Sequence, residues 1–415
     1  MSHRRSALIS GAGIAGPALA YWLNEYGWQV TVVEAAPGIR PGGQTVDLRG
    51  AGRTVIERMG LMPAARAACV EQKGIAWVDA SGRHRSEMPV DAFGGDGIVS
   101  EVEILRGDLA SLLYSAADDH VEYLFGTRIT ALDDSGDEVT VTLSDGTVRT
   151  VDLVFGADGP HSAVRRSVFG PEEDVVHPVG GYTAWFTAPS TSMDTHGWYE
   201  MFQAPGGLVA SIRPDTDPTR MKASLAFASE PLMYDRNDID AQRSLIAERF
   251  AGTGWHAPQL AEAARTAEDF YLDALVQVRM DSWTSGRVAL VGDAGYCPCP
   301  LTGMGTSLAL VGAYVLAGEL AAADGDHRRA FARYEQVLRP YVEQGQQMPG
   351  GGMKMFAPKS AFVIRVGQML NRAITSRVLQ PLARKMFFSH AENIELPDYS
   401  TAPEQQMSEQ LRSAR

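Results

Sequence analysis

The sequence predicts an α/β fold: a nucleotide-binding domain, interrupted by an inserted, mostly antiparallel β-sheet domain and followed by C-terminal helices. Three observations support this prediction. An apolar strand near the N-terminus meets a glycine-rich turn that opens a helix. Two later apolar strands end in Asp-Gly or Gly-Asp pairs, again shortly before helices. Between those two strands lie short aromatic and β-branched segments separated by Pro, Gly and Asp, a pattern typical of antiparallel strands.

The glycine-rich turn is Gly11-Ala-Gly13-Ile-Ala-Gly16, which fits the first βαβ unit of a Rossmann fold. Gly11 permits the tight turn, Gly13 lets backbone N–H groups reach a pyrophosphate, and Gly16 lets the helix pack closely on the strand. The phosphates then lie at the positive end of the helix dipole. The next β-branched strand ends on Glu34, where the carboxylate can accept hydrogen bonds from ribose hydroxyls.

The segment after Glu34 is a loop that adjoins the predicted nucleotide site. Residues 35–50 are rich in Gly and Pro and carry Asp47 and Arg49, which either contact a cofactor or form a surface ion pair. Arg106 stands before a helix over 109–117, where it can face a cofactor. The other elements predicted up to residue 155 are a helix over 51–59, a hairpin over 74–90, and strands over 121–125, 128–132, 138–143 and 148–155.

Two further strand-to-helix connections resemble ligand sites. One strand runs into Gly156-Ala-Asp158-Gly159, so the Asp158 carboxylate is expected at the carboxyl edge of the sheet, where ligands gather in open α/β folds. A later pair of strands, over 272–280 and 287–291, ends in Gly292-Asp293 and a Gly- and Pro-rich loop. The helix over 306–323 follows, and N–H groups at its start can hold an anionic ring edge. We predict that it is a buried helix and not a membrane span.

The region from 171 to 280 is predicted as the inserted sheet, with flanking helices over 240–250 and 257–266. Its aromatic residues can be ordinary core, but a sheet over a cofactor domain also suits a flat apolar substrate. These aromatic residues are Trp185, Trp198, Tyr199, Phe202 and Phe227. The C-terminal part is predicted as helices over 327–347 and 359–388, and the polar residues 396–415 are expected to be frayed.

Composition limits the function classes. The formal net charge of −13 argues against binding to nucleic acid or to an anionic membrane surface. Cys69, Cys297 and Cys299 provide no disulfide framework and no CxxC motif, which favours a reducing, cytoplasmic location and no metal site.

Taken together, the three motifs resemble those of the class A flavoprotein monooxygenases, the aromatic hydroxylase family. The similarity is greatest to the branch of tetracycline-inactivating and polyketide-tailoring enzymes. It rests on the glycine turn with Glu34, on Asp158-Gly159 with Ser162 and Arg165, and on Gly292-Asp293 before Pro300 and Gly303-x-Gly305. The residues that this resemblance assigns to FAD are Gly11, Gly13, Ile14, Ala15, Gly16, Glu34, Asp47, Arg106, Asp158, Gly292, Asp293, Pro300, Gly303, Met304 and Gly305.

The resemblance also implies a reaction. NADPH or NADH reduces the flavin, O₂ adds at its C4a carbon, and the hydroperoxide transfers one oxygen atom to an aromatic or polyketide-like small molecule. The protein supplies orientation and a dry site. A side chain that acts as a base or hydrogen-bond donor at the oxygen of a phenol would assist its hydroxylation. The candidates for this role are His196, Tyr199, Gln203 and Arg213. The expected partners are the small-molecule substrate and O₂, and the expected oligomeric state is monomer or homodimer.

The resemblance suggests domain boundaries. The FAD-binding domain would comprise residues 1–73, 106–170 and 283–347, the substrate domain residues 74–105 and 171–282, and the helical extension residues 348–415. Tyr296, Ser307 and Gly312 depart from the family's pattern of His, Asn and a helix acid, and we expect all three near the flavin ring.

Several alternatives stay open at this point. The same flavin chemistry can give Baeyer–Villiger, epoxidation or oxidative decarboxylation products. A hydride-transfer reductase and a non-enzymatic flavin-binding sensor are the other readings. The absence of a WxWxIP stretch argues against flavin halogenases, and the absence of CxxC argues against disulfide reductases.

Overall fold

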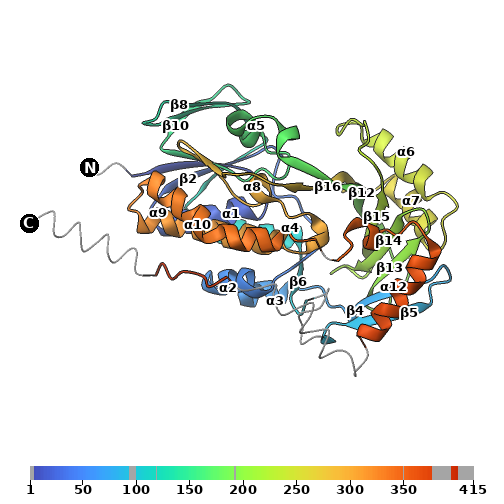
Figure 1. Cartoon of the computed structure of the whole chain (residues 1–415). Helices are drawn as coiled ribbons and strands as arrows, with labels where there is room; N and C mark the ends of the chain where they lie inside the picture. The colour runs from blue at the N-terminus through green and yellow to red at the C-terminus, as the bar shows by residue number, and fades with distance from the viewer. Residues whose placement is uncertain are drawn as a thin grey trace, which may run out of the picture.

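The computed structural model describes residues 4–92, 100–117, 119–190, 193–348, 350–375 and 394–400. Two large sheets, each with its own helices, lie side by side (Figure 1). A six-stranded sheet carries the glycine-rich turn, and a seven-stranded sheet is built from the inserted segments. The predicted α/β fold class with an inserted sheet and C-terminal helices is confirmed.

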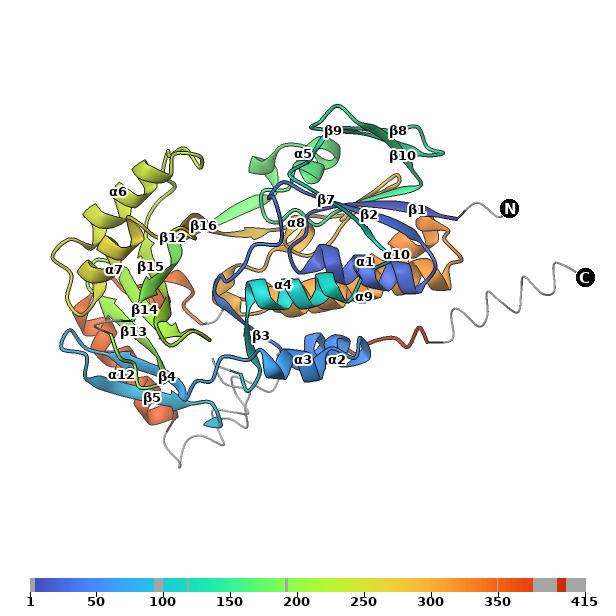
Figure 2. The same ribbon diagram turned by 180° about the vertical axis from the view of Figure 1, so that it is seen from behind.

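The six-stranded sheet has the order β17-β18-β11-β1-β2-β7 and is parallel except at its β17 edge. Its central strands are almost entirely buried, as expected for a parallel sheet covered on both faces. Helices α1 Ala15–Glu25, α9 Gly305–Ala322 and α10 His327–Gly345 lie on one face, and the small sheet of β8 Ile129–Asp134, β9 Val139–Leu143 and β10 Val148–Val151 lies on the other (Figures 1 and 2). The strands are β1 Ser6–Ser10, β2 Gln29–Glu34, β7 Glu122–Phe125, β11 Leu153–Gly156, β17 Thr284–Ser285 and β18 Val288–Leu290.

The strand predicted over 148–155 is in fact two strands in different sheets. β10 Val148–Val151 pairs with β9 Val139–Leu143 in the small sheet, whereas β11 pairs with β1. The chain changes sheet at Asp152, whose carboxylate accepts hydrogen bonds from the Ser6 N–H (2.7 Å) and hydroxyl (2.8 Å). This anchoring of the corner by a side chain cannot be seen in the strand's apolar pattern. The third strand of the small sheet is β8 Ile129–Asp134.

The seven-stranded sheet has the order β16-β12-β15-β14-β13-β4-β5. The hairpin predicted over 74–90 forms its β4–β5 edge, and β4 joins β13 in parallel. Helices α6 Ile239–Phe250 and α7 Ala257–Ala264 cover one face, whereas the other face packs against α11 Met353–Phe356, α12 Ala361–Ile374 and the loop after Asp293. The strands are β4 Gly74–Val78, β5 His84–Pro89, β12 Val176–Pro189, β13 Trp198–Ala204, β14 Leu208–Pro214, β15 Arg220–Ala228 and β16 Tyr271–Val278.

The long apolar helix α9 Gly305–Ala322 is the central helix of the nucleotide-binding domain. It is long and apolar enough to cross a membrane, but 89% of it is buried within the fold, where it packs against α1, α2 and α10. The other helices are α1 Ala15–Glu25, α2 Gly50–Arg58, α3 Met62–Ala67, α4 Arg106–Ser115, α5 Ala163–Phe169, α8 Asp293–Tyr296, α10 His327–Gly345, α11 Met353–Phe356 and α12 Ala361–Ile374.

Two expectations about the C-terminal part need comment. The helix predicted over 359–388 is observed as α12 up to Ile374, and residues 376–393 lie outside the described part. The prediction that residues 396–415 are frayed is wrong for 396–400. Tyr399 is buried, its hydroxyl donates to Glu319 Oε1 at 2.8 Å, and its ring lies where a side chain on Gly318 would be. Residues 401–415 are outside the described range.

Candidate active site

The glycine-rich turn meets the Asp158 turn backbone to backbone. Gly11 has a φ of 107°, and a Cβ on it would lie 2.5 Å from the Ala157 carbonyl oxygen. A Cβ on Gly16 would lie 1.9 Å from the Gly11 carbonyl oxygen. Neither position can carry a side chain without moving the main chain, so the close approach of β1, α1 and β11 requires glycine at both.

Arg106, the first residue of α4, lies over this turn. Its Nη2 atom would be 3.2 Å from a Cβ on Gly13, so the guanidinium lies directly beside the Gly13 backbone. Glu34 marks the other side of the turn. Its carboxylate accepts hydrogen bonds from the N–H groups of Ala12 and Ala36, both at 2.8 Å. A cation and a fixed carboxylate therefore flank the N-terminus of α1, as a dinucleotide site requires.

The Asp158 carboxylate is only half satisfied. Its Oδ2 atom accepts from Ala163 N (2.8 Å) and Val164 N (3.3 Å) at the start of α5, while Oδ1 is buried with no hydrogen-bond partner among the described residues. A buried acceptor without a donor is costly. Oδ1 is thus available to accept a hydrogen bond from a bound ligand.

Arg165 connects this turn to the Asp293 turn. Its side chain is fully buried, and its guanidinium donates to the carbonyl oxygens of Ala294 (2.8 Å) and Pro160 (2.5 Å). Ser162 caps α5 by accepting from Arg165 N at 2.9 Å. The two motifs that are 135 residues apart in sequence are therefore held together by one guanidinium.

Asp293 begins α8 at the end of β18. Burial raises the pKa of its carboxyl, against the lowering effect of Arg106. Its Oδ1 atom would be 3.8 Å from a Cβ on Gly305, so the carboxylate lies at the N-terminus of α9. The intervening loop is strained at Cys299, which has a φ of 76°, and such strain is typical of functional loops.

Asp47 and Arg49 approach the same loop. A Cβ on Gly303 would be 3.9 Å from Asp47 Oδ2, and Asp47 is paired with Arg49. Ser307 at the start of α9 directs its hydroxyl to the Arg49 carbonyl oxygen at 3.5 Å. The pair is largely buried, with 13% of the Asp47 side chain and 20% of the Arg49 side chain exposed, so it is not a surface ion pair. Asp47 instead lies beside the loop that contains Pro300, Gly303, Met304 and Gly305.

Two of the three family departures do not face this loop. Tyr296 is fully buried, packs against Trp283 with its ring tilted by 58°, and shares a hydrogen bond of 2.9 Å with the Tyr334 hydroxyl on α10. A Cβ on Gly312 would lie 1.9 Å from the Tyr296 hydroxyl oxygen. Our expectation that both positions lie near the flavin ring is wrong, because the tyrosine side chain points into the core between α9 and α10. Ser307 is the departure that lies at the loop.

Alternating residues of the seven-stranded sheet face opposite ways. Phe186, Phe202 and Phe227 pack toward α6 and α7. The other set forms a second apolar cluster that also contains Cys299 and Leu301 of the loop after Asp293, and Met353 and Ala357 at the two ends of α11. This set, which we call the substrate face, includes Ile75, Trp77, Trp185, Tyr199, Met201, Val209 and Leu275.

The four catalytic candidates are not all together. Arg213 stacks over the Tyr199 ring, with its guanidinium carbon 3.8 Å from the ring centre, and both lie on the substrate face. Gln203 is on the same face, but its amide donates to the carbonyl oxygens of Met355 (3.2 Å) and Phe356 (2.8 Å), so it fastens α11 to the sheet. His196 is separate. Its side chain is 77% exposed on a turn and pairs with Asp194.

A model of the FAD-binding domain family matches residues 4–347. The chain belongs to this family. An uncharacterised protein of Mycobacterium tuberculosis is 44% identical over 357 residues, which are 84% of this chain and 94% of that protein. A protein of Legionella longbeachae named flavin-dependent monooxygenase is 37% identical over 402 residues, covering 97% of this chain and 100% of that protein.

The crystal structure of tetracycline destructase Tet(55) is similar over 96% of this chain and 100% of that chain, with a TM-score of 0.79 and 38% identity. With the family match and the named relatives, this shows that the protein is an FAD-dependent monooxygenase of the class A type, as the three sequence motifs indicated.

The residues present fit FAD. Backbone N–H groups around Gly13 and the Arg106 guanidinium suit the pyrophosphate, and Glu34 suits the adenosine ribose. The unpartnered Asp158 Oδ1 and the Asp293 carboxylate suit hydroxyl donors of the FAD ribose and ribityl chain. Pro300 to Gly305 would then hold the isoalloxazine ring. No groups of metal-ligating side chains occur among the described residues of the monooxygenase.

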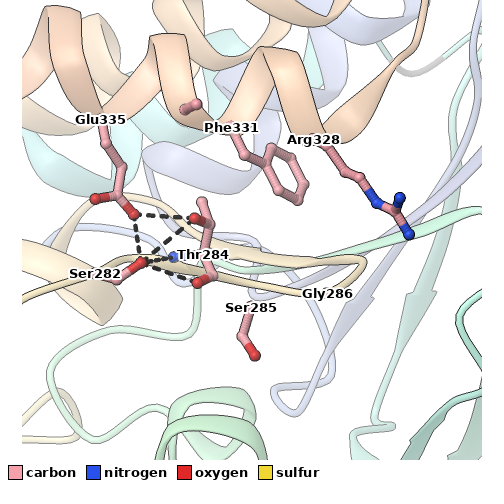
Figure 3. Close-up of a pocket in the computed structure, with 8 residues that line it drawn as sticks. Ser282, Thr284, Ser285, Gly286, Arg328, Phe331 and Glu335 are labelled. Carbon is pink, nitrogen blue, oxygen red and sulfur yellow. Dashed lines mark hydrogen bonds between the residues drawn. The ribbon is translucent and has the colours of Figure 1, made fainter.

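A pocket of about 440 Å³ lies elsewhere in the monooxygenase, between β17 and α10 (Figure 3). Its polar groups bond one another, because Glu335 accepts from the Ser282 hydroxyl (2.7 Å) and the Thr284 hydroxyl (3.0 Å). It contains none of the residues that fit FAD, and it is not part of the candidate active site.

Sequence reasoning missed one residue of the site. Glu103 is 3% exposed and bonds Arg213 Nη1 through its Oε2 atom at 3.2 Å. It precedes Arg106 in the apolar segment Val102-Glu-Ile-Leu. The sequence could have indicated this residue, because an acid within an apolar segment that becomes buried needs a charged or hydrogen-bonding partner.

Proposed function

We propose that this monooxygenase inserts one oxygen atom from O₂ into an aromatic or polyketide-type small molecule, with NADPH or NADH as the reductant. The observation that carries the proposal is the substrate face. Aromatic and thioether side chains from four strands pack against Cys299 and Leu301 of the loop assigned to the flavin ring, and Tyr199 with Arg213 supplies the polar group among them. An apolar site with few convergent polar groups suits a flat polycyclic substrate.

The roles of the chain's own residues follow from their positions. Trp77, Trp185 and Met201 exclude water from the ring loop and orient a planar molecule by stacking. Arg213 and Tyr199 hold an oxygen of the substrate. Bound FAD supplies the activation of O₂ and the transfer of its oxygen atom, which no side chain of this chain can do.

His196 is excluded from this proposal by its exposure, and Gln203 by its bonds to α11. We further propose that the enzyme acts on secondary metabolites or antibiotics as a cytoplasmic monomer or homodimer. Similarity to structures named tetracycline destructases makes tetracycline a rational first compound to test.

The test is a screen of tetracycline and phenolic polyketides with purified holoenzyme under ¹⁸O₂ in air-free buffer. A substrate is expected to accelerate NADPH or NADH oxidation and to gain one ¹⁸O atom, measured by mass spectrometry. NMR of the product then separates hydroxylation from Baeyer–Villiger or epoxide products. Product formed without O₂ would show a hydride-transfer reductase, and bound flavin with no compound-stimulated oxidation would support the sensor reading.

A further inference from the structure

Two carboxyl groups face each other between the domains. β3 Thr45–Asp47 and β6 Glu103–Leu105 form an antiparallel pair in which Asp47 is directly opposite Glu103. Like charges at opposed positions of an antiparallel pair destabilise it. The sequence nevertheless places two acids here, one of them only 3% exposed, so the pair is a local conflict of the kind found at functional sites.

A proton on Glu103 resolves the conflict. Burial first, and then the neighbouring Asp47 carboxylate, raise the pKa of Glu103 to about 8. The neutral Glu103 carboxyl then donates to the Asp47 carboxylate, which is also paired with Arg49. At neutral pH Glu103 therefore carries no full charge.

The protonated Glu103 leaves the charge of Arg213 unneutralised. Glu103 is the carboxyl partner of Arg213 at 3.2 Å, and the guanidinium otherwise lies on the Tyr199 ring. Arg213 Nε is buried and has no hydrogen-bond partner among the described residues, and the same is true of Gln72 Oε1, whose amide nitrogen donates to Glu103 Oε2. Unpaired buried polar atoms around one point indicate a place for a ligand or water.

Other charges that face this cluster do not cancel Arg213. Lys222 lies opposite Arg213 across the β14–β15 pair, and it is matched by Asp215 at 3.1 Å. Asp47 is matched by Arg49. The Arg213 guanidinium is thus a buried positive charge on the substrate face, held between Glu103 and the Tyr199 ring.

We propose that Arg213 binds an anionic oxygen of the substrate, a phenolate or the enolate of a β-diketone, and that Glu103, which lies opposite Asp47 and contacts Arg213, is a positioning residue that leaves the guanidinium available for this contact. The inference rests on the proposed function and adds the two residues that recognise an acidic hydroxyl group of the substrate, Arg213 directly and Glu103 through Arg213. Above pH 8 Glu103 ionises and pairs fully with Arg213, so the affinity for an anionic oxygen falls. Below pH 8 the contact is available.

The experiment measures tetracycline binding to FAD-loaded enzyme by calorimetry from below to above the pKa of about 8. Tetracycline is the probe because it carries both enol and phenol groups. In the wild type, Kd is expected to rise about tenfold per pH unit above that pKa, as for a single linked proton. Glu103→Gln is expected to bind tightly with a flat profile, and Arg213→Gln to bind at least about tenfold more weakly at every pH.

Glu200→Gln is the matched control. Glu200 is also buried, but it bonds His84 and lies on the face opposite Arg213, so its pH profile is expected to match the wild type. Equal pH dependence in Glu103→Gln and wild type overturns the inference, and so does the absence of tetracycline binding by the wild type at every pH. Binding that depends on Arg213 without any oxygenated product overturns the proposed function and leaves the inference standing.

Discussion

The hydroxyl oxygen of Tyr296 occupies the space next to Gly312, where a Cβ would lie only 1.9 Å away. The tyrosine bonds Tyr334, whose hydroxyl donates to the Leu290 carbonyl oxygen at 3.0 Å. The two residues lie 16 positions apart in sequence and depart from the family pattern together. Their contact gives a physical reason: the larger side chain at 296 needs the missing side chain at 312.

We expect Gly312→Ala to destabilise the protein, because α9 and α8 must separate or the tyrosine must leave its rotamer. Overpacking of a buried site costs about 1–3 kcal/mol. Chemical unfolding of the holoenzyme measures this loss. In the double variant with Tyr296→Phe the clash with the hydroxyl oxygen is gone. The loss of stability in the double variant should therefore be smaller than the sum of the losses in the two single variants.

Gly367→Ala is the matched control for this series. Gly367 is in α12, and nothing lies within 4 Å of a Cβ built on it, so alanine should be neutral or slightly stabilising. Gly312→Ala with the stability of Gly367→Ala would contradict the packing argument.

Asp293→Ala is expected to lose FAD while the fold stays largely intact. The carboxylate lies at the N-terminus of α9 beside Gly305, and burial already disfavours its charge, which raises its pKa. Removing it therefore does not weaken the apoprotein, whereas a hydrogen bond to a charged group contributes about 1.5–3 kcal/mol to FAD binding. FAD retention after gel filtration and circular dichroism measure the two effects.

Asp133→Ala is the control for Asp293→Ala, since Asp133 lies exposed on β8. Full flavin occupancy in Asp293→Ala would show that Asp293 does not contact FAD.

Local motifs explain why so much of the site was predictable. Gly11 to Gly16 and Glu34 belong to one βαβ unit, so their spacing along the chain determines their relative positions in the structure. The pairing of Asp47 with Glu103 and the stacking of Arg213 on Tyr199 depend on the relative placement of two domains. The hydrophobic periodicity of a sequence predicts helices and strands, but it does not predict how two domains are placed relative to each other.

The incorrect expectations have the same origin. Tyr296 and Gly312 were assigned to the flavin ring by their motif positions, but the direction of the side chain depends on α10, which comes later in the chain. His196 is a candidate from the sequence because a histidine in the inserted sheet region can act on a phenol oxygen, but it lies on a turn with a φ of 50° and its side chain is exposed. The polar composition after residue 396 predicts a frayed terminus, but Tyr399 packs against α9 in the space left by the missing side chain of Gly318.

Arg165→Leu is expected to weaken both stability and FAD binding. The fully buried guanidinium joins the Asp158 and Asp293 turns, and its loss leaves the carbonyl oxygens of Ala294 and Pro160 without their donor. An unsatisfied buried acceptor costs about 1–3 kcal/mol. Unfolding in urea and FAD titration of the apoprotein are the measurements, with Arg166→Leu as the exposed neighbouring control. An equal effect of both substitutions would contradict the bridging role.

His161, in the turn after Asp158, gives the last prediction. Its ring bonds Glu172 Oε1 (2.8 Å) and Asp273 on β16 (3.0 Å), and so joins the two domains. Burial alone would raise the pKa of Asp273, but the hydrogen bonds from His161 and Tyr271 hold it below its usual range.

A carboxyl whose pKa is lower in the folded protein stabilises the fold above its unfolded pKa of about 3.9, and this contribution is lost as pH falls through the folded pKa. Asp273→Asn should therefore reduce stability at neutral pH and lessen the loss of stability on acidification. Urea midpoints at pH 7 and in the acid range measure both effects, and Asp269→Asn, whose carboxylate bonds Thr187 at the exposed end of the sheet, is the control. Equal acid sensitivity in Asp273→Asn and wild type would show that the contact between His161 and Asp273 does not stabilise the domain junction.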